Sequence, residues 1–380
     1  MNLAHPVKLA LSFGLLLLTC SGMAQVQTNV DYKLFHMGGE TSVRSGLALS
    51  PDGNTVACAG AQGFPLFLYD WRNDKILKKF DVGNWYAGAK VEYSAKGTYL
   101  LLQQTFYIDW APNKDREVDF EIVNAESGEI VQKINAAHSV AIAYDESFYV
   151  VLQGDDVSFY ELPSGRMMRK FTVENATNAV AISPDGKQVA VSHMPTAQLL
   201  QDVPSIRLDK KAIKPALKYR QMISIYDAGS MELIKTINEI YDIIYRLQYS
   251  HDGYRLFSYS IPHTKMQTST AGRQGYIYMI RMPEGDVLRT SFMSLAPYEP
   301  DFTENNEKTL FGVVSFDVAP QINLYDFEKG KLENRFDTRQ RLRDAINNKM
   351  AGDSRASFAF LPDDSIIIVT GNQTIIWKPE

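Results

Sequence analysis

The chain has 380 residues, of which 45% are hydrophobic and 22% charged, and this composition excludes a largely disordered protein. Its net charge of −5 argues against a general nucleic-acid-binding protein, because such domains are usually basic. Aromatic residues make up 11% of the sequence, which favours strands over helices. We therefore expect a globular, strand-rich protein whose partner is not a nucleic acid.

The first 24 residues have the features of a secretory signal peptide. Lys8 precedes an apolar segment from Leu9 to Leu18, and the small-residue stretch that follows ends at Ala24, where we predict cleavage. The apolar segment is too short for a membrane-spanning helix, which needs roughly 20 residues. We therefore predict an exported protein, periplasmic or associated with the outer membrane of a Gram-negative bacterium, without a transmembrane segment after cleavage.

A second interpretation of the same segment is lipidation. The sequence from Leu17 to Cys20 resembles a lipobox, in which the cysteine is acylated and becomes the mature N-terminus, although Thr19 stands where Gly, Ala or Ser is usual. Acylation of Cys20 would attach the protein peripherally to the outer membrane. Cleavage after Ala24 would instead remove Cys20 and leave Cys58 as the single cysteine of the mature chain. We expect Cys58 to be a small buried hydrophobic residue.

A turn motif recurs along the rest of the chain. Ser-Pro-Asp-Gly at 50–53 returns at 183–186, with Ser-His-Asp-Gly at 250–253, and weaker copies lie at 94–97, 144–147, 305–307 and 361–364. Each copy lies between two short segments in which apolar residues alternate. Because proline presets φ and Asp-Gly favours a tight turn, each copy predicts a hairpin.

A second motif follows each of these turns. It is an apolar segment that ends in Tyr-Asp in three copies, and the copies lie at 66–70, 120–124, 157–161, 223–227, 276–280, 322–326 and 374–377. A polar turn, usually containing glycine, then leads to another strand segment. One unit is therefore four strands, a to d, with one motif turn between a and b and a polar turn between c and d. The sequence contains seven such units.

Four-stranded units with a base period of about 40 residues resemble the WD40-type β-propeller family over the whole mature chain. The resemblance implies an all-β, seven-bladed propeller in a single domain at 25–380, with blades at about 44–80, 88–134, 138–171, 177–237, 244–292, 297–336 and 356–377 plus 31–36. Tyr-Asp replaces the family's Trp-Asp dipeptide in three blades, the dipeptide is degenerate in the others, and the Gly-His pair is missing. The chain is therefore similar to a divergent bacterial branch, and the family's peptide-binding residues are not transferred to it.

The two ends of the mature chain are predicted to meet. The last unit has strand segments at 357–361, 366–370 and 374–377, and the chain then ends at Glu380 without a strand d. One strand segment at 31–36 precedes the first unit and belongs to no other. We expect this segment to be the outer strand of the last blade, which closes the ring and removes an open sheet edge.

The insertions of the propeller are expected on one face. In this fold the b–c and d–a connections emerge on one side, here called the elaborated face, and the a–b and c–d turns on the other, the turn face. The long segments are all b–c or d–a connections, at 104–117, 193–220, 261–274 and 337–355. The second carries a net charge of +4 and the last two +2 each, which leaves −13 for the remainder. The elaborated face is therefore the candidate binding surface, although solvated loops are often basic without any partner.

Aromatic and basic side chains of these long connections and of the d–a connection after blade 1 are the candidate partner-binding residues, namely Trp85, Tyr86, Phe106, Tyr107, Trp110, Lys210, Lys211, Lys214, Arg339, Arg341 and Arg343. Aromatic rings of this kind form stacking platforms or interface hot spots, and they also pack on one another to order a long loop. Residues 338–350 have the apolar spacing of a short amphipathic helix that caps the face.

No familiar catalytic or metal-binding spacing is present, since the six histidines are isolated and no nucleophile elbow or phosphate loop occurs. We expect no catalytic residue, no metal and no cofactor. The favoured function is an exported, non-enzymatic interaction scaffold or accessory subunit that binds a protein partner in the bacterial envelope. Two alternatives stay open: a propeller hydrolase or lactonase acting on a small anionic substrate at the central channel, and the binding of an envelope glycan or lipid.

Overall fold

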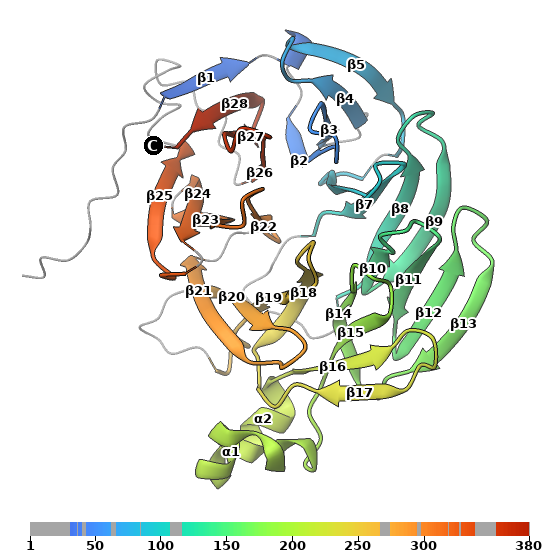
Figure 1. Cartoon of the computed structure of the whole chain (residues 1–380), viewed down its shortest axis with the longest axis vertical. Helices are drawn as coiled ribbons and strands as arrows, with labels where there is room; N and C mark the ends of the chain where they lie inside the picture. The colour runs from blue at the N-terminus through green and yellow to red at the C-terminus, as the bar shows by residue number, and fades with distance from the viewer. Residues whose placement is uncertain are drawn as a thin grey trace, which may run out of the picture.

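The computed structural model describes residues 31–35, 37–39, 43–61, 66–83, 85–106, 116–266, 274–294, 298–317, 319–326, 328–338 and 355–379. These residues form seven four-stranded antiparallel sheets arranged as blades in a ring (Figure 1). The predicted seven-bladed propeller is therefore confirmed. The predicted signal peptide, Cys20, and all but the first residue of the predicted helix at 338–350 lie outside the described residues.

The first four blades follow one another along the chain. Blade 1 consists of β2 (Arg44–Leu49), β3 (Thr55–Gly60), β4 (Leu66–Asp70) and β5 (Lys75–Phe80). Blade 2 consists of β6 (Ala89–Tyr93), β7 (Tyr99–Gln104), β8 (Val118–Asn124) and β9 (Ile130–Ala137). Blade 3 consists of β10 (Ser139–Ile142), β11 (Phe148–Gln153), β12 (Asp156–Glu161) and β13 (Met167–Thr172). Blade 4 consists of β14 (Ala176–Ile182), β15 (Gln188–His193), β16 (Met222–Asp227) and β17 (Leu233–Thr236).

The last three blades complete the ring. Blade 5 consists of β18 (Ile243–Tyr249), β19 (Arg255–Ile261), β20 (Gln274–Arg281) and β21 (Val287–Ser294). Blade 6 consists of β22 (Phe302–Glu304), β23 (Leu310–Asp317), β24 (Ala319–Asp326) and β25 (Leu332–Asp337). Blade 7 consists of β26 (Ala356–Phe360), β27 (Ile366–Thr370), β28 (Gln373–Lys378) and β1 (Asp31–Phe35), and a short 3-10 helix, η1 (Met37–Gly39), follows β1.

The repeated Ser-Pro-Asp-Gly motif forms the a–b turns through its own side chains. In blade 1 the Ser50 hydroxyl donates to Asp52 at 2.5 Å and accepts the amide N–H of Thr55 at 2.9 Å. The same pair of hydrogen bonds occurs in blades 4 and 5, around Ser183 and Ser250. Because serine and aspartate satisfy the backbone of the turn locally, the motif specifies a hairpin wherever it occurs.

The aspartate that ends strand c has a comparable local role. Asp70, at the end of β4, accepts the amide N–H groups of Arg72 and Asn73, and Asp227 does the same for Gly229 and Ser230 at the end of β16. The carboxylate therefore satisfies the backbone donors of the c–d turn, as expected of an Asx turn. The aspartate of the Tyr-Asp motif is therefore explained by its hydrogen bonds to the c–d turn.

The hydrophobic core is divided among the contacts between neighbouring blades. Seven clusters of buried residues each combine side chains from two adjacent blades, so that the set runs around the whole ring. The cluster between blades 6 and 7, for example, contains Phe336 and Trp377, whose ring centroids are 5.3 Å apart. Cys58 is fully buried between blades 7 and 1, as expected, and burial raises the pKa of its thiol to about 12.

Blade 7 joins the two ends of the described chain. β1 pairs antiparallel with β28 over five residue pairs, from Asp31 opposite Lys378 to Phe35 opposite Thr374. The N-terminal strand is thus the outer strand of the last blade, and the predicted closure of the ring is confirmed. This pairing covers the backbone edge that β28 would otherwise expose.

Removal of β1 tests the closure. A chain that begins at residue 37 should be less stable than one that begins at residue 25 by about 3–5 kcal/mol, because several backbone hydrogen bonds of about 1 kcal/mol each are lost. The exposed edge of β28 should also promote self-association. Calorimetry and size-exclusion chromatography of the two chains measure these effects. Equal melting temperatures and equal elution volumes would contradict a stabilising role for the closure.

Candidate functional site

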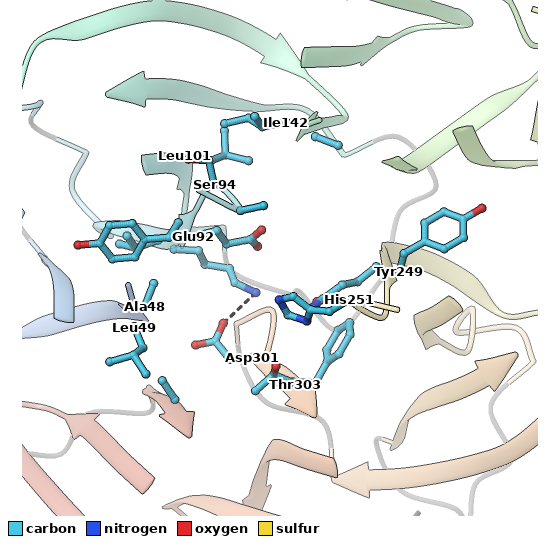
Figure 2. A pocket seen from close by; sticks show the side chains of 18 of the residues that line it. Ala48, Leu49, Glu92, Ser94, Leu101, Ile142, Tyr249, His251, Asp301 and Thr303 are labelled. Carbon is cyan, nitrogen blue, oxygen red and sulfur yellow. Dashed lines mark ion pairs between the residues drawn. The ribbon is translucent and has the colours of Figure 1, made fainter. Parts of the chain in front are cut away.

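The centre of the ring contains a cavity of about 770 Å³, within the range of about 300–1,000 Å³ that is usual for small-molecule sites. The first strand of every blade lines it, namely β2, β6, β10, β14, β18, β22 and β26. The cavity extends to the a–b turns, where Asp52, Ala95 and His251 are exposed to solvent. We call this space the channel cavity; its mouth lies on the turn face, and Figure 2 shows part of its lining.

A buried carboxylate lies at the other end of the channel cavity, away from the a–b turns. Glu299 lies in the connection between blades 5 and 6 and pairs with Lys90 of β6 at 3.5 Å and with Arg116, which precedes β8. The side-chain amide of Gln103, in β7, donates to the same carboxylate at 3.0 Å. The connection before blade 6 is therefore tied to blade 2, and we call Glu299 with Lys90, Arg116 and Gln103 the floor cluster.

Arg116 extends the floor cluster to two more blades. Its guanidinium donates to the carbonyl oxygen of His138 at 2.7 Å and to that of Asn178 at 3.3 Å. Its own amide N–H donates to the side chain of Asn178 at 2.7 Å. His138 precedes the first strand of blade 3, and Asn178 lies in the first strand of blade 4. One arginine thus links blades 2, 3 and 4 to the connection that enters blade 6.

The surroundings of Glu299 hold it in the ionised form. Burial by itself would raise the pKa of Glu299, but the positive charges of Lys90, Arg116 and Arg246, together with the hydrogen bond from Gln103, lower it to about 2. An acid with so low a pKa does not donate protons near neutral pH. Glu299 is therefore suited to holding the floor together rather than to acid catalysis.

A second set of charges lies closer to the mouth. Arg246, in β18 of blade 5, reaches Glu92, in β6 of blade 2, and its guanidinium lies over the Phe302 ring with 5.0 Å to the centroid. Asp301 accepts from the Lys90 amino group at 3.1 Å, the ion pair drawn in Figure 2, and from the Ser357 hydroxyl. Blades 2 and 5 are thereby joined across the channel, as are blade 2 and the start of blade 6.

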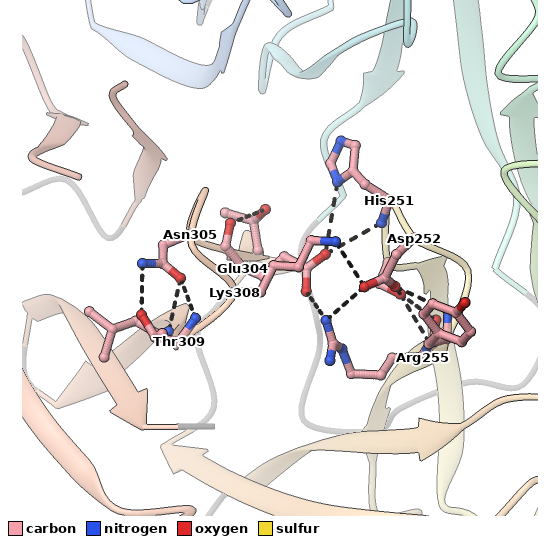
Figure 3. Close-up of polar contacts among 11 residues, drawn as sticks. His251, Asp252, Arg255, Glu304, Asn305, Lys308 and Thr309 are labelled. Carbon is pink, nitrogen blue, oxygen red and sulfur yellow. Dashed lines mark hydrogen bonds and ion pairs between the residues drawn. The ribbon is translucent and has the colours of Figure 1, made fainter. Parts of the chain in front are cut away.

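A third network stands at the rim of the mouth, between blades 5 and 6 (Figure 3). Arg255 pairs with Glu304 at 3.1 Å and with Asp252 at 3.3 Å, and Lys308 pairs with Asp252 at 2.8 Å. Burial opposes ionisation of Asp252, but hydrogen bonds from Lys308 and Ser250 outweigh it and hold the pKa of that carboxyl well below its usual range. Between blades 5 and 6, the rim is therefore held together by ion pairs.

The predicted partner-binding residues are not gathered into one site by the described residues. Tyr86 is 80% exposed after blade 1, whereas Trp85 is half-buried against the core between blades 1 and 2. Phe106 is half-buried within the ring, 5.7 Å from Tyr245 and 4.9 Å from the Arg116 guanidinium, measured to the ring centroid. The remaining aromatic and arginine candidates, Tyr107, Trp110, Arg339, Arg341 and Arg343, lie outside the described residues.

The three lysine candidates belong to a different part of the ring. Lys210 begins a short 3-10 helix, and Lys211 and Lys214 are exposed, within the long connection between β15 and β16 of blade 4. That connection is far along the chain from Tyr86 and is carried by another blade. The basic and aromatic candidates therefore remain two separate predictions.

The charged residues of the channel were missed by the sequence analysis. Lys90, Glu92 and Arg246 lie in first strands, β6 and β18, where most positions are apolar. A charged side chain within the innermost strand of a blade could have predicted a polar channel, because that strand faces the channel rather than bulk solvent. Glu299 and Arg116 lie in connections, and nothing in their local sequence predicted burial.

The described residues contain no group of three or more His, Cys, Asp or Glu side chains that could hold a metal ion. No helix in the described part of the chain is both long and apolar enough to cross a membrane. Comparison of the sequence with protein-family models and with curated proteins found no match.

Substitution of Glu299 by Gln tests the floor cluster. At about pH 7 the variant should lose about 3–5 kcal/mol of unfolding free energy, because Lys90 and Arg116 would stay buried without their carboxylate. Glu161, an exposed partner of Arg166 on blade 3, supplies the matched control, and Glu161→Gln should change stability little. Urea denaturation of the three proteins measures the difference.

The pH dependence of the same variant gives a second readout. The pKa of Glu299 is about 2 in the folded protein and ordinarily 4.5, so between these values the unfolded chain binds more protons than the folded one. The stability that this carboxylate contributes is therefore complete above about pH 4.5 and is lost as the pH falls towards 2. The deficit of Glu299→Gln should shrink over that interval, and a deficit that does not depend on pH would contradict the assignment.

Proposed function

We propose that the protein is an exported, non-enzymatic interaction module of the bacterial envelope, a divergent WD40-like propeller that binds an acidic protein partner through its elaborated face. The proposal places it in the periplasm or at the outer membrane of a Gram-negative bacterium, in keeping with the signal-peptide features of residues 1–24. The observation that carries it is a folded, basic insertion in blade 4, which we call the helical insertion and define as residues 199–219.

The helical insertion has a structure and a small core of its own. It consists of η2 (Leu199–Asp202), α1 (Pro204–Leu208), η3 (Lys210–Ala212) and α2 (Ile213–Tyr219). It projects outward from the outer edge of the ring (Figure 1). Leu200, Val203, Ile206 and Ala216 are buried together with Met222 at the start of β16. An insertion that is ordered in this way presents its outer side chains in a defined arrangement, which suits recognition.

The outer surface of the helical insertion is basic and carries unneutralised charge. Its exposed cations are Arg207, Lys211, Lys214 and Lys218. None of the four forms an ion pair with another described residue. Cations without an intramolecular counter-ion favour association with a complementary acidic surface, since they steer encounter and disfavour basic partners.

The helical insertion also packs against the next blade. The ring of Tyr219, at the end of α2, lies 4.5 Å from the ring of His263 in blade 5, measured between centroids. Arg220 pairs with the buried Asp242 at the start of blade 5. These contacts fix the base of the insertion on two blades, so its basic surface has a constant orientation relative to the ring.

The hydrolase alternative has less support from the channel. Glu92, Glu299 and Asp301 each pair with a lysine or arginine. The pKa of Glu299 is lowered to about 2, which does not suit a proton donor near neutral pH. For glycan or lipid binding, Tyr86 is the one exposed aromatic among the described partner-binding candidates. The interaction module is therefore the function that the described geometry supports best.

Charge reversal on the helical insertion tests the proposal. The double variant Lys211→Glu/Lys214→Glu should recover its envelope partner at least about tenfold less than the wild type in affinity purification with quantitative mass spectrometry, because the acidic partner would meet repulsion. Higher salt should weaken the wild-type interaction as well, since exposed charges are screened.

The matched control is Lys187→Glu/Lys331→Glu, which reverses the same number of charges in an a–b turn and a c–d turn on the turn face. This control should recover the partner as the wild type does. Equal recovery by both double variants at low salt would contradict a role for the helical insertion.

A further inference from the structure

The channel cavity is a second candidate site, separate from the helical insertion. It is lined by the first strands of all seven blades and by the floor cluster, and it extends to the turn face. Its lining by all seven blades distinguishes it from a surface groove, and a cavity of about 770 Å³ is large enough for a small organic ligand. The chemistry of its lining restricts the class of that ligand.

The charges that line the channel cavity below the rim balance one another. Below the rim, three cations face three carboxylates, namely Lys90, Arg116 and Arg246 with Glu92, Glu299 and Asp301. Because these groups compensate one another, the cavity has no excess charge of one sign to attract a ligand with a large net charge. The cost of removing such a ligand from water would therefore not be offset. The cavity therefore favours a ligand whose own charges also sum to zero.

The ion pair between Glu92 and Arg246 is the exchangeable one. The Lys90 amino group is held by three oxygen atoms, on Glu299, Pro300 and Asp301, at 3.5, 3.1 and 3.1 Å. The Glu92 side chain is instead 45% exposed, against 15% for Arg246, and Arg246 is its ion-pair partner among the described residues. Rotation of Glu92 towards solvent would free a guanidinium that is already oriented by the Phe302 ring.

The contact between Glu92 and Arg246 also limits the spacing of the ligand's charges. A ligand carboxylate can replace that of Glu92 on the guanidinium, and Glu92 can then accept a ligand ammonium. Because Glu92 and Arg246 are in direct contact at the outset, a small rotation of Glu92 that admits a ligand carboxylate leaves the two side chains adjacent, so the two ligand charges must lie close together as well. The headgroup of an α-amino acid has this spacing, whereas the termini of an extended peptide do not.

Part of the wall above the charges is apolar. Leu101 and Ile142, both labelled in Figure 2, line the cavity from blades 2 and 3, and Phe358 and Phe360 line it from blade 7. A ligand that contacts these walls gains about 25 cal/mol for each Å² of apolar surface removed from water. The remainder of the ligand is therefore expected to be bulky and apolar.

We propose that the channel cavity binds a free α-amino acid with a large apolar side chain, its carboxylate on Arg246, its ammonium on Glu92 and its side chain against the apolar walls. The site rests on residues and on a face that the helical insertion does not share. Binding of the amino acid and binding of the envelope partner can therefore be tested independently.

Calorimetric titration of the full mature chain tests the proposal with L-phenylalanine and L-leucine as probes. At least one should bind with a dissociation constant below about 1 mM. N-acetyl-L-phenylalanine lacks the ammonium and L-phenylalaninamide lacks the carboxylate, so each should bind at least about tenfold more weakly than L-phenylalanine. These arms need no variant and do not depend on the folding of one.

Two variants assign the binding to the channel. Arg246→Gln should weaken binding at least about tenfold, because the ligand carboxylate loses its cation. Arg166→Gln is the matched control, since it removes an exposed arginine of the same kind of pair on the outer side of blade 3, and its affinity should equal that of the wild type. Circular dichroism of both variants verifies the fold.

Three results would each overturn the proposal. The first is no binding of either amino acid at about 10 mM. The second is equal affinity for L-phenylalanine and its two blocked analogues, or for the wild type and a folded Arg246→Gln variant. The third is tighter binding of the dipeptide L-leucyl-L-leucine than of both amino acids, which would show that adjacent charges are not required.

Discussion

The packing of each blade against its two neighbours is the constraint on which the rest of this molecule depends. A four-stranded blade has two faces to bury, and seven inter-blade clusters bury them in turn around the ring. A ring of blades packed in this way is held closed only when the first and last strands of the chain belong to the same blade. The pairing of β1 with β28 meets this requirement through backbone pairing, and the burial of Phe35 and Met37 accompanies it.

Closure of the ring creates a central space that inter-blade packing does not fill. Blades on opposite sides of the ring do not pack against each other, so their connection must come from long side chains or from a connection that enters the channel. The protein uses both, since Arg246 reaches Glu92 across the channel and Glu299 arrives in a connection to meet Lys90 and Arg116. Charged groups suit this position because the channel retains polar partners for each of them.

The same geometry separates two surfaces. The mouth of the channel cavity opens among short, internally hydrogen-bonded turns, whereas the helical insertion extends from a b–c connection of blade 4. A b–c connection can grow without disturbing a hairpin, since its residues do not set the register of the strands that it joins. A small ligand in the channel and a protein on the insertion would therefore not compete for the same residues.

The sequence alone determined the architecture of this protein because its signals are local and repeated. Ser50 with Asp52, and Asp70 with the amide groups after it, complete their hydrogen bonds within a few residues, so each turn could be read without knowing the fold. The missing last strand at the C-terminus and the extra strand at 31–36 then predicted the closure, since a propeller leaves one place for that strand.

Only the tertiary structure decided the channel. Glu299 is 183 residues from Arg116 and 209 from Lys90, and its burial follows from the path of the connection before blade 6 rather than from any local pattern. For the same reason Phe106, expected on a surface, is half-buried against Tyr245 from another blade. Hydrogen bonds inside one turn are specified by neighbouring residues, whereas charges that meet at the centre of a ring are brought together only when every blade is in place.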